Sequence, residues 1–356
     1  MYKLTIIALL TILGISSCRE NQNDEGSVQD EPEITVKPRR ISIDNTQIDT
    51  IKLVCPSNFL LGVIDKLVVG ESYIMAADFS QTKRAAVFDD HGNFLQGIDF
   101  DGPGPEEYNG IKDIDIRKKE GIYSFYILDH HGYCKVFDSD GLLSSIDVPY
   151  NVSEIAALED EIVFKSEMYS SEKFGDNLDG DLVFQNGNDF EVFGKKGDRT
   201  NIPIFECNAL ASNENAVVVS DVFDNSIKVY DRRKLVNQVK ISYQDKEFDM
   251  NFFSKEFADP LERINAFNEQ EGAYHIPNLF IDSKTIFSSI MKDREHKTIV
   301  LDYEEERGEV WEKFIINARH QSNMKLMEAK GGYLYFLSPE SYDATQIAVL
   351  KIRRPE

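Results

Sequence analysis

Short apolar stretches alternate with turns rich in Asp and Gly along most of this chain. The segment at 73–100 reads as an apolar strand, a hairpin, a second strand and a further turn that Gly92 closes. Five other segments follow the same order more or less closely, near 123–150, 161–194, 215–243, 285–315 and 333–352. Self-similarity at a fixed period is typical of repeat proteins, so the pattern predicts six copies of one β-rich unit.

The spacing of the apolar residue at the centre of each third strand gives the period of this repeat. This residue falls at intervals of 49, 48, 45, 71 and 49 residues, at Val87, Val136, Phe184, Val229, Val300 and Val349. Short strands with a period of 45–49 residues are typical of a four-stranded propeller blade, whereas a β-helix has a much shorter rung. The sequence therefore predicts an all-β fold, a six-bladed β-propeller of four-stranded blades.

The last unit has room for only three strands before the sequence stops. Residues 48–54, in contrast, alternate polar and apolar side chains at strand period and belong to no complete unit. We expect this N-terminal strand to close the ring as the fourth strand of the last blade. Closure of this kind removes the open sheet edge that would otherwise invite aggregation.

The one long interval holds extra residues at about 244–279. Apolar residues recur there at helical spacing, and Asp259-Pro260 followed by Glu262 has the form of a helix start. We expect one or two short helices inserted between blades four and five. Their aromatic residues serve packing in the simplest interpretation and a ligand surface in the other.

The N-terminus carries an export signal. Lys3 precedes an uncharged run from Leu4 to Ile15, which is too short to cross a ~30 Å hydrocarbon core but has the size of a signal-peptide apolar region. Ile15-Ser16-Ser17-Cys18 resembles a lipobox, which implies a signal peptide at 1–17 and a lipid on Cys18. An ordinary cleaved signal or an uncleaved apolar start is the alternative.

Residues 18–40 are expected to form a lipidated, disordered tether, because they offer few large apolar side chains to bury. The propeller then occupies 41–356. Arg19 stands where an inner-membrane retention signal usually has Asp, which favours anchoring in the outer membrane. Whether the protein faces the periplasm or the cell surface stays open.

Charge and cysteine content limit the partners and the chemistry. The formal net charge of −23 makes nucleic acid a poor partner, since nucleic acid needs a positive field. Cys55, Cys134 and Cys207 remain after Cys18, so they form at most one disulfide and leave one free thiol. Their spacing is not that of metal ligands, and we expect small buried residues.

One loop connects the chain to a known family. The segment Gly102-Pro103-Gly104-Pro105-Glu106-Glu107-Tyr108 resembles the Gly-x-Gly-Pro-Gly-Glu-aromatic loop after the first blade of six-bladed β-propeller lipoproteins of Bacteroidetes, relatives of the NHL and TolB-like propellers. Glu106 stands where that family commonly has its last glycine. The resemblance covers essentially the whole chain and implies architecture, but fold alone does not fix function.

The candidate ligand-binding residues lie on one rim of the predicted propeller. They are Gly104, Glu106, Glu107, Tyr108, His130 and His131. The glutamates could bind a cation or a basic ligand at the channel mouth, but in a simpler interpretation one of them fixes the Gly/Pro loop by accepting backbone N–H bonds. The histidines in their simpler interpretation belong to a polar hairpin turn. Asp78, Asp129 and Asp221 recur at the end of the second strand, which indicates turn formation.

The chain lacks a nucleophile elbow, a phosphate-binding loop and a zinc-protease motif. We therefore assign no catalytic residue, metal or cofactor, and favour a binding or scaffold module whose rim recognises an envelope protein, a peptide or a glycan. The alternative is a metal-dependent hydrolase or lyase with its site at the central channel. That alternative requires inward polar residues, and the first strands VIDKLVV and NMKLMEA offer few.

Overall fold

The structure is a computed structural model. It describes residues 33–43, 47–102, 104, 106–167, 180–194, 208–214, 216–243, 247–249, 251–252, 255, 257, 259–292, 295–316, 319–320, 326–338 and 346–355. The predicted signal peptide, Cys18, the first part of the tether and Cys207 lie outside the described residues.

Most of the described chain forms six four-stranded antiparallel units, of which four are separate sheets and two are joined through one further strand into a ten-stranded sheet; each unit is called a sheet below. The first three are β3 (Lys66–Val69), β4 (Tyr73–Asp78), β5 (Arg84–Asp89) and β6 (Phe94–Ile98); β7 (Ile111–Lys119), β8 (Ile122–Asp129), β9 (Tyr133–Asp138) and β10 (Gly141–Asp147); and β11 (Val152–Ala157), β12 (Ile162–Ser166), β13 (Leu182–Asn186) and β14 (Asp189–Phe193). The other three are β15 (Leu210–Ser212), β16 (Val217–Ser220), β17 (Ser226–Asp231) and β18 (Lys234–Tyr243); β19 (Tyr274–Asp282), β20 (Thr285–Lys292), β21 (Glu295–Asp302) and β22 (Arg307–Ile316), which β23 (Arg319–His320) extends; and β24 (Leu326–Lys330), β25 (Tyr333–Leu337), β26 (Gln346–Arg353) and β2 (Ile48–Val54).

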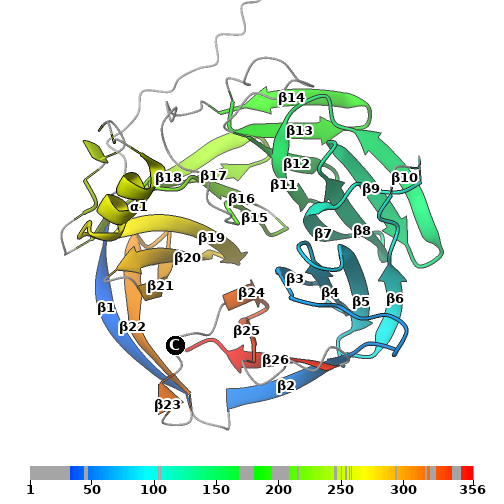
Figure 1. Ribbon diagram of the computed structural model, residues 1–356, viewed down its shortest axis with the longest axis horizontal. Coiled ribbons are helices and arrows are strands. Elements are labelled where there is room, and N and C mark those ends of the chain that lie inside the picture. The colour runs from blue at the N-terminus through cyan, green and yellow to red at the C-terminus, as the bar shows by residue number, and fades with distance from the viewer. Residues whose placement is uncertain are drawn as a thin grey trace, which may run out of the picture. The chain divides into compact units, whose positions relative to one another are not determined.

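The sheets follow one another around a ring. The first strand of each sheet contacts the first strand of the next, from β3 through β7, β11, β15 and β19 to β24, and β24 contacts β3 again (Figure 1). The middle strands are buried on both faces, because each sheet is covered by its two neighbours; in β4 every residue from Ile74 to Asp78 is buried. This is the arrangement of a six-bladed β-propeller.

The last sheet combines both halves of the sequence. β2 pairs antiparallel with β26 over its whole length, from Ile48 opposite Ile352 to Val54 opposite Gln346. The alternation of polar and apolar residues in β2 reflects burial: Leu53 is fully buried between the sixth and first sheets, whereas Asp49 is exposed. The N-terminal strand therefore occupies the outer edge of the sixth blade.

A further strand, β1 (Glu33–Ile43), corrects the prediction of a disordered tether through residue 40. Its first part pairs parallel with β18 and its second part pairs parallel with β22, so it joins the outer edges of the fourth and fifth sheets. The sequence signal that the tether prediction missed is alternation. Ile34, Val36, Ile41 and Ile43 are buried, and most residues between them are exposed.

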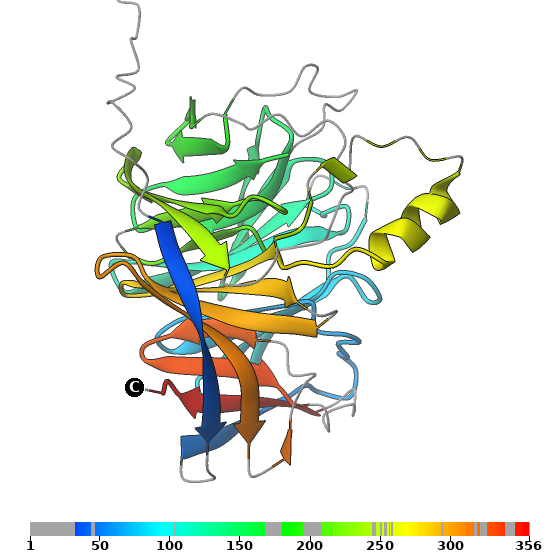
Figure 2. The ribbon, with the colours of Figure 1, turned by 90° about the vertical axis from the view of Figure 1, so that its left-hand side faces the viewer.

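The link between β18 and β19 carries the helix α1 (Pro260–Asn268). Asp259 caps it by accepting the backbone N–H of Glu262 at 2.8 Å, and a proline occupies its first turn. In Figure 2 the helix stands away from the strands, on one side of the sheets. Phe267 of α1 and Phe248 of the link belong to one aromatic cluster, which packs against Phe223 and Tyr274.

We expect Ile34→Ala to lower the free energy of unfolding by about 2–5 kcal/mol, because the side chain is only 2% exposed and packs in the core that the fourth and fifth sheets share. The neighbouring exposed Thr35 gives the matched control, and Thr35→Ala should change it by less than about 0.5 kcal/mol. Urea unfolding measures both. Equal effects of the two substitutions would show that β1 is not packed on the propeller.

Candidate functional site

Polar side chains on the innermost strands connect one sheet to the next. Lys66 on β3 forms an ion pair with Asp113 on β7, with Nζ and Oδ1 2.6 Å apart. The second oxygen of Asp113 accepts the backbone N–H of Ile155 on β11 at 2.9 Å. Asp115 accepts the N–H of Ala157 in the same way, at 2.6 Å. Two carboxylates of the second sheet thus hold the free edge of the third.

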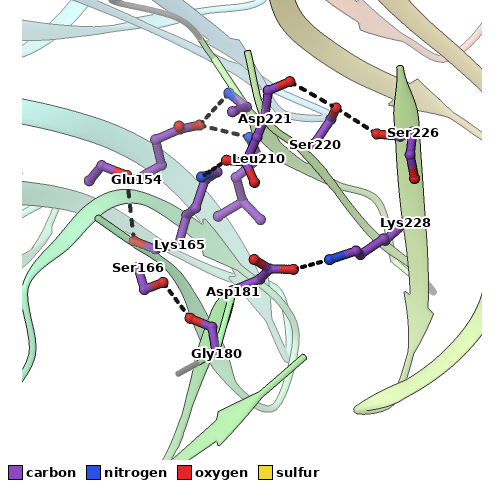
Figure 3. Close-up of polar contacts among 12 residues, drawn as sticks. Glu154, Lys165, Ser166, Gly180, Asp181, Leu210, Ser220, Asp221, Ser226 and Lys228 are labelled. Atoms are coloured by element: carbon purple, nitrogen blue, oxygen red, sulfur yellow. Dashed lines mark hydrogen bonds and ion pairs between the residues drawn. The ribbon is translucent and has the colours of Figure 1, made fainter. Parts of the chain in front are cut away.

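The same arrangement continues around the ring. The Oε2 of Glu154 on β11 accepts the backbone N–H groups of Ala209 and Leu210, each at 2.7 Å, as Figure 3 shows. Asn208 donates its amide to Leu279 O at 2.6 Å, and Asn278 donates to Leu326 O at 3.2 Å. In each case a side chain of one sheet binds backbone at the first strand of the next sheet. These contacts satisfy backbone groups that no further strand can pair.

The innermost strands are therefore more polar than the sequence led us to expect. Besides Asp113, Asp115 and Glu154, the segments VIDKLVV and NMKLMEA contribute Lys66 and Glu328. Sequence reasoning missed these residues because strand alternation does not tell which face of a first strand lies toward the axis.

Burial raises the pKa of several of these carboxyl groups. It raises the pKa of Asp115 to about 6, and the pKa of Glu154 and of Glu328 to about 7. Lys66 opposes the shift at all three by Coulomb attraction. A carboxyl group in this range can exchange a proton near neutral pH. Asp115 and Glu154 nevertheless have oxygens bound to backbone N–H groups of the next sheet, so their geometry fits a structural role.

Two buried ion pairs lie beside Glu154, between the third and fourth sheets (Figure 3). Lys165 on β12 binds Asp221, which follows β16, at 2.6 Å. Lys228 on β17 binds Asp181, which precedes β13. Both pairs cross from one sheet to the other, and removing one partner from such a pair is strongly destabilising because it leaves a buried charge uncompensated.

A buried histidine connects the fourth and fifth sheets. The Nδ1 of His275 lies 3.2 Å from the hydroxyl of Ser220, and its Nε2 lies 2.7 Å from the hydroxyl of Ser288. A histidine next to a serine hydroxyl can act as the general base that activates the serine as a nucleophile. His275 is however fully buried, and Ser220 donates to the backbone oxygen of Ser226 at 2.7 Å. The group holds two sheets together and is closed to a substrate.

No group of three or more His, Cys, Asp or Glu side chains in the described part of the chain is arranged to hold a metal ion. Among the same residues, no helix is long and apolar enough to cross a membrane. Cys55 and Cys134 are both buried free thiols, and burial raises the pKa of Cys55 to about 11.

The rim loop places its candidate residues in different environments. Glu107 accepts the backbone N–H of Gly104 at 2.7 Å, which is the fixing role that the sequence offered as the simpler interpretation. Tyr108 is fully buried, and its hydroxyl donates to Lys83 O at 2.7 Å. The candidate role of Tyr108 in ligand contact is therefore wrong: its ring packs in the core between the first two sheets. Glu106 is exposed.

The turn that contains His130 and His131 lies against this loop. His130 donates its backbone N–H to Asn109 O at 3.3 Å, and the ring of His131 contacts the amide of Asn109. Both histidines are exposed by their overall accessible surface, and desolvation of the part of the His130 ring that faces the protein lowers its pKa. The structure thus brings Glu106, His130 and His131 to one end of the first two sheets.

The repeated aspartates mostly form turns, as predicted. Asp78 accepts the backbone N–H groups of Gln81 and Thr82, at 2.8 and 3.1 Å, and Asp129 accepts those of His131 and Tyr133, at 2.9 and 2.8 Å. Asp221 differs, because it also binds Lys165 of the neighbouring sheet.

The architecture agrees with a family model. The model of the six-bladed β-propeller family designated DUF5128 matches residues 19–337. The chain belongs to this family. No curated protein matches the sequence.

The comparison with solved structures found matches of low sequence identity. BF0058 of Bacteroides fragilis NCTC 9343, which is named as an exported protein, superposes with a TM-score of 0.65 at 13% identity, over 91% of this chain and 100% of that one. BamB of Moraxella catarrhalis gives a TM-score of 0.41 at 7% identity, over 83% of this chain and 73% of that one. At 13% identity the likeness to BF0058 is one of fold alone.

Because the pKa of Glu328 is raised in the folded protein, the free energy of unfolding should depend on pH. Between pH 5 and 7 the folded protein retains a proton on Glu328 that the unfolded chain releases, so this contribution to stability is present at low pH and is lost as the pH rises through about 7. In Glu328→Gln the decline of the unfolding free energy with pH should be shallower by up to about 1.4 kcal/mol per pH unit, the value for one proton.

Urea unfolding at intervals from pH 5 to 7.5 measures this difference. Glu71→Gln is the control, because a hydrogen bond from Lys118 lowers the pKa of Glu71 and removes its titration from this window. Parallel curves for Glu328→Gln and the unsubstituted protein would contradict the assignment.

Proposed function

We propose that this protein is a binding or scaffold module of the cell envelope. Its partner is an envelope protein, a peptide or a glycan, bound at the end of the propeller that carries the Gly102–Tyr108 loop and α1. Links between consecutive sheets all lie at the same end of a four-stranded antiparallel blade, so these two features share one face. The observation that carries the proposal is the insertion around α1, which no blade needs for its own pairing.

The aromatic cluster gives this insertion a fixed position. Phe223 follows β16, and its ring centroid lies 5.1 Å from that of Phe248 and 4.8 Å from that of Tyr274 at the start of β19. Phe248 in turn lies 5.6 Å from Phe267 of α1. Aromatic pairs at these distances stabilise beyond the area that they bury. A pre-ordered projection of this kind reduces the entropy cost of binding a partner.

The inner strands support binding over catalysis at the axis. Asp113, Asp115 and Glu154 accept backbone N–H groups of the neighbouring sheet, and Asp113 also binds Lys66. These carboxylates are therefore occupied by the contacts that hold the ring. Binding of a partner on the rim does not require these carboxylates to be free.

We infer that lipid on Cys18 holds the propeller at the outer membrane. Residues 19–32 separate Cys18 from β1 and span at most about 50 Å when extended. Several acyl chains on one cysteine give stable membrane attachment, which a single chain does not. With a net charge of −23 the protein is repelled by anionic headgroups, so the lipid and not the protein surface supplies the attraction.

A photo-crosslinking residue at Asn265 should capture a discrete partner in intact cells. Asn265 is exposed on α1. The matched control is Asp140, which is exposed in the turn between β9 and β10 at the opposite end of the strands. Mass spectrometry identifies the captured species. Capture of the same species from both positions, or from Asp140 alone, would remove the partner from the α1 face.

Cys18→Ser should transfer the protein from the membrane fraction to the soluble envelope fraction. The substitution removes the only lipid attachment that the sequence indicates. Fractionation followed by mass spectrometry of the N-terminal peptide measures both location and acylation, with Cys55→Ser as the control because Cys55 is buried in the core. A Cys18→Ser protein that stays in the membrane fraction would overturn the anchor.

A further inference from the structure

We propose that the gap between the second and third sheets binds a small organic carboxylate, with Arg117 as the residue that recognises it. A cavity of about 350 Å³ lies there. Its floor contains the buried Tyr126 and Ile162, and its rim contains the exposed Ser144 and Asn186. The volume falls within the range of small-molecule sites in proteins.

The cavity results from the size of the side chains that lie between the two sheets. Their facing sides share an apolar cluster that contains Leu128, Cys134 and Phe164 and that reaches the cavity at Tyr126 and Ile162. The rest of the lining includes the small residues Ser124 and Gly187. Small side chains fill little of the space between the sheets, so a concave site remains.

Arg117 on β7 is the chemically unusual residue of this cavity. Its guanidinium carbon lies 5.4 Å from the ring centroid of Tyr126, and its Nη1 makes one long hydrogen bond to Leu158 O at 3.5 Å. Its Nε is buried and has no hydrogen-bond partner among the described residues. Within the same part of the chain, no carboxylate forms an ion pair with Arg117, although Asp160 and Glu161 line the cavity.

Those two acids already have cationic partners. Asp160 binds Lys119 at 3.2 Å, and Glu161 binds Arg233 at 2.8 Å. Of the two cations in the lining, Lys119 is paired with an acid, whereas no described carboxylate forms an ion pair with Arg117. A single guanidinium matches a single carboxylate, with which it can form two parallel hydrogen bonds.

Two other arginines with the same stacking show what Arg117 lacks. Arg84 lies 5.5 Å from the ring of Phe59 and binds Asp99 at 2.7 Å. Arg233 lies 5.7 Å from the ring of Phe184 and binds both Glu161 and Glu191. In both cases the aromatic ring covers the guanidinium and at least one carboxylate binds it, although the Nε of Arg84, like that of Arg117, is buried without a hydrogen-bond partner among the described residues. At Arg117 the ring is present, and we assign the carboxylate to the ligand.

The remaining lining defines the body of the ligand. Ser124, Ser144 and Asn186 offer hydroxyl and amide groups, while Leu143 is 61% exposed and offers an apolar contact. A carboxylate whose body carries hydroxyl or amide groups fits this lining. A free sugar acid and a peptide carboxyl terminus share that chemistry. The turns that border the cavity, at 158–161 and 187–188, lie at the end of the strands opposite the links between sheets, so this site is separate from the face that carries α1.

Ligand-observed NMR with the mature chain, residues 19–356 with its lipid cysteine omitted, tests the site. The probes are glucuronate with glucose as its neutral counterpart, and N-acetyl-alanyl-serine with its C-terminal amide. We expect the carboxylate of at least one pair to bind, and the neutral counterpart to bind at least about tenfold more weakly. The pair that binds identifies the source of the carboxylate.

Three variants connect binding to the cavity. Arg117→Gln should weaken the bound carboxylate at least about tenfold, while Arg84→Gln, which removes a stacked arginine that has its own acid, should leave binding unchanged. Ser144→Trp fills the cavity from an exposed position and should abolish binding in a protein with an unchanged circular dichroism spectrum. Three results would overturn the proposal: equal binding of charged and neutral probes, binding unaffected by Arg117→Gln or Ser144→Trp, or no binding of either carboxylate at millimolar concentration. None of these bears on crosslinking at Asn265.

Discussion

The ring depends on how the innermost strands satisfy their free edges. Each of these strands pairs with its own sheet on one side only, and the N–H groups on its other side have no strand to bind. Asp113, Asp115 and Glu154 supply the missing acceptors from the preceding sheet. Because an unpaired buried N–H costs about as much as a lost hydrogen bond, these carboxylates fix the spacing of the second, third and fourth sheets.

The outer edges are closed by different means. β2 covers β26 and joins the two halves of the chain in one sheet, while β1 lies parallel to both β18 and β22. The long link that carries α1 separates the fourth sheet from the fifth in sequence, and β1 holds their outer edges together on the other side of that junction. Residues 33–43, which include the end of the segment predicted as a tether, are thus part of the fold.

Two surfaces follow from this construction. Links between sheets are free to vary at one end of the strands, because they carry no pairing, and in one such link the described residues around Phe248 pack in an aromatic cluster. At the other end a cavity that contains Arg117 lies between the second and third sheets. The two proposals, a partner on the α1 face and a small carboxylate between blades, rest on these separate consequences of a radial arrangement of sheets.

The sequence by itself determined the repeat. Third-strand residues from Val87 to Val349 recur at a period of one blade, residues 48–54 alternate at strand period, and Asp259-Pro260 begins a helix; each signal is local, because it reflects which face of a single element is buried. The same alternation was present in residues 33–43, but it was outweighed there by the charged residues around it. Tertiary structure alone decided which residues from different blades meet. It placed Tyr108 in the core, Asp113 against Ile155 and Arg117 over Tyr126 without an acid, because such contacts depend on the packing of one sheet against the next and leave no periodic pattern in the chain.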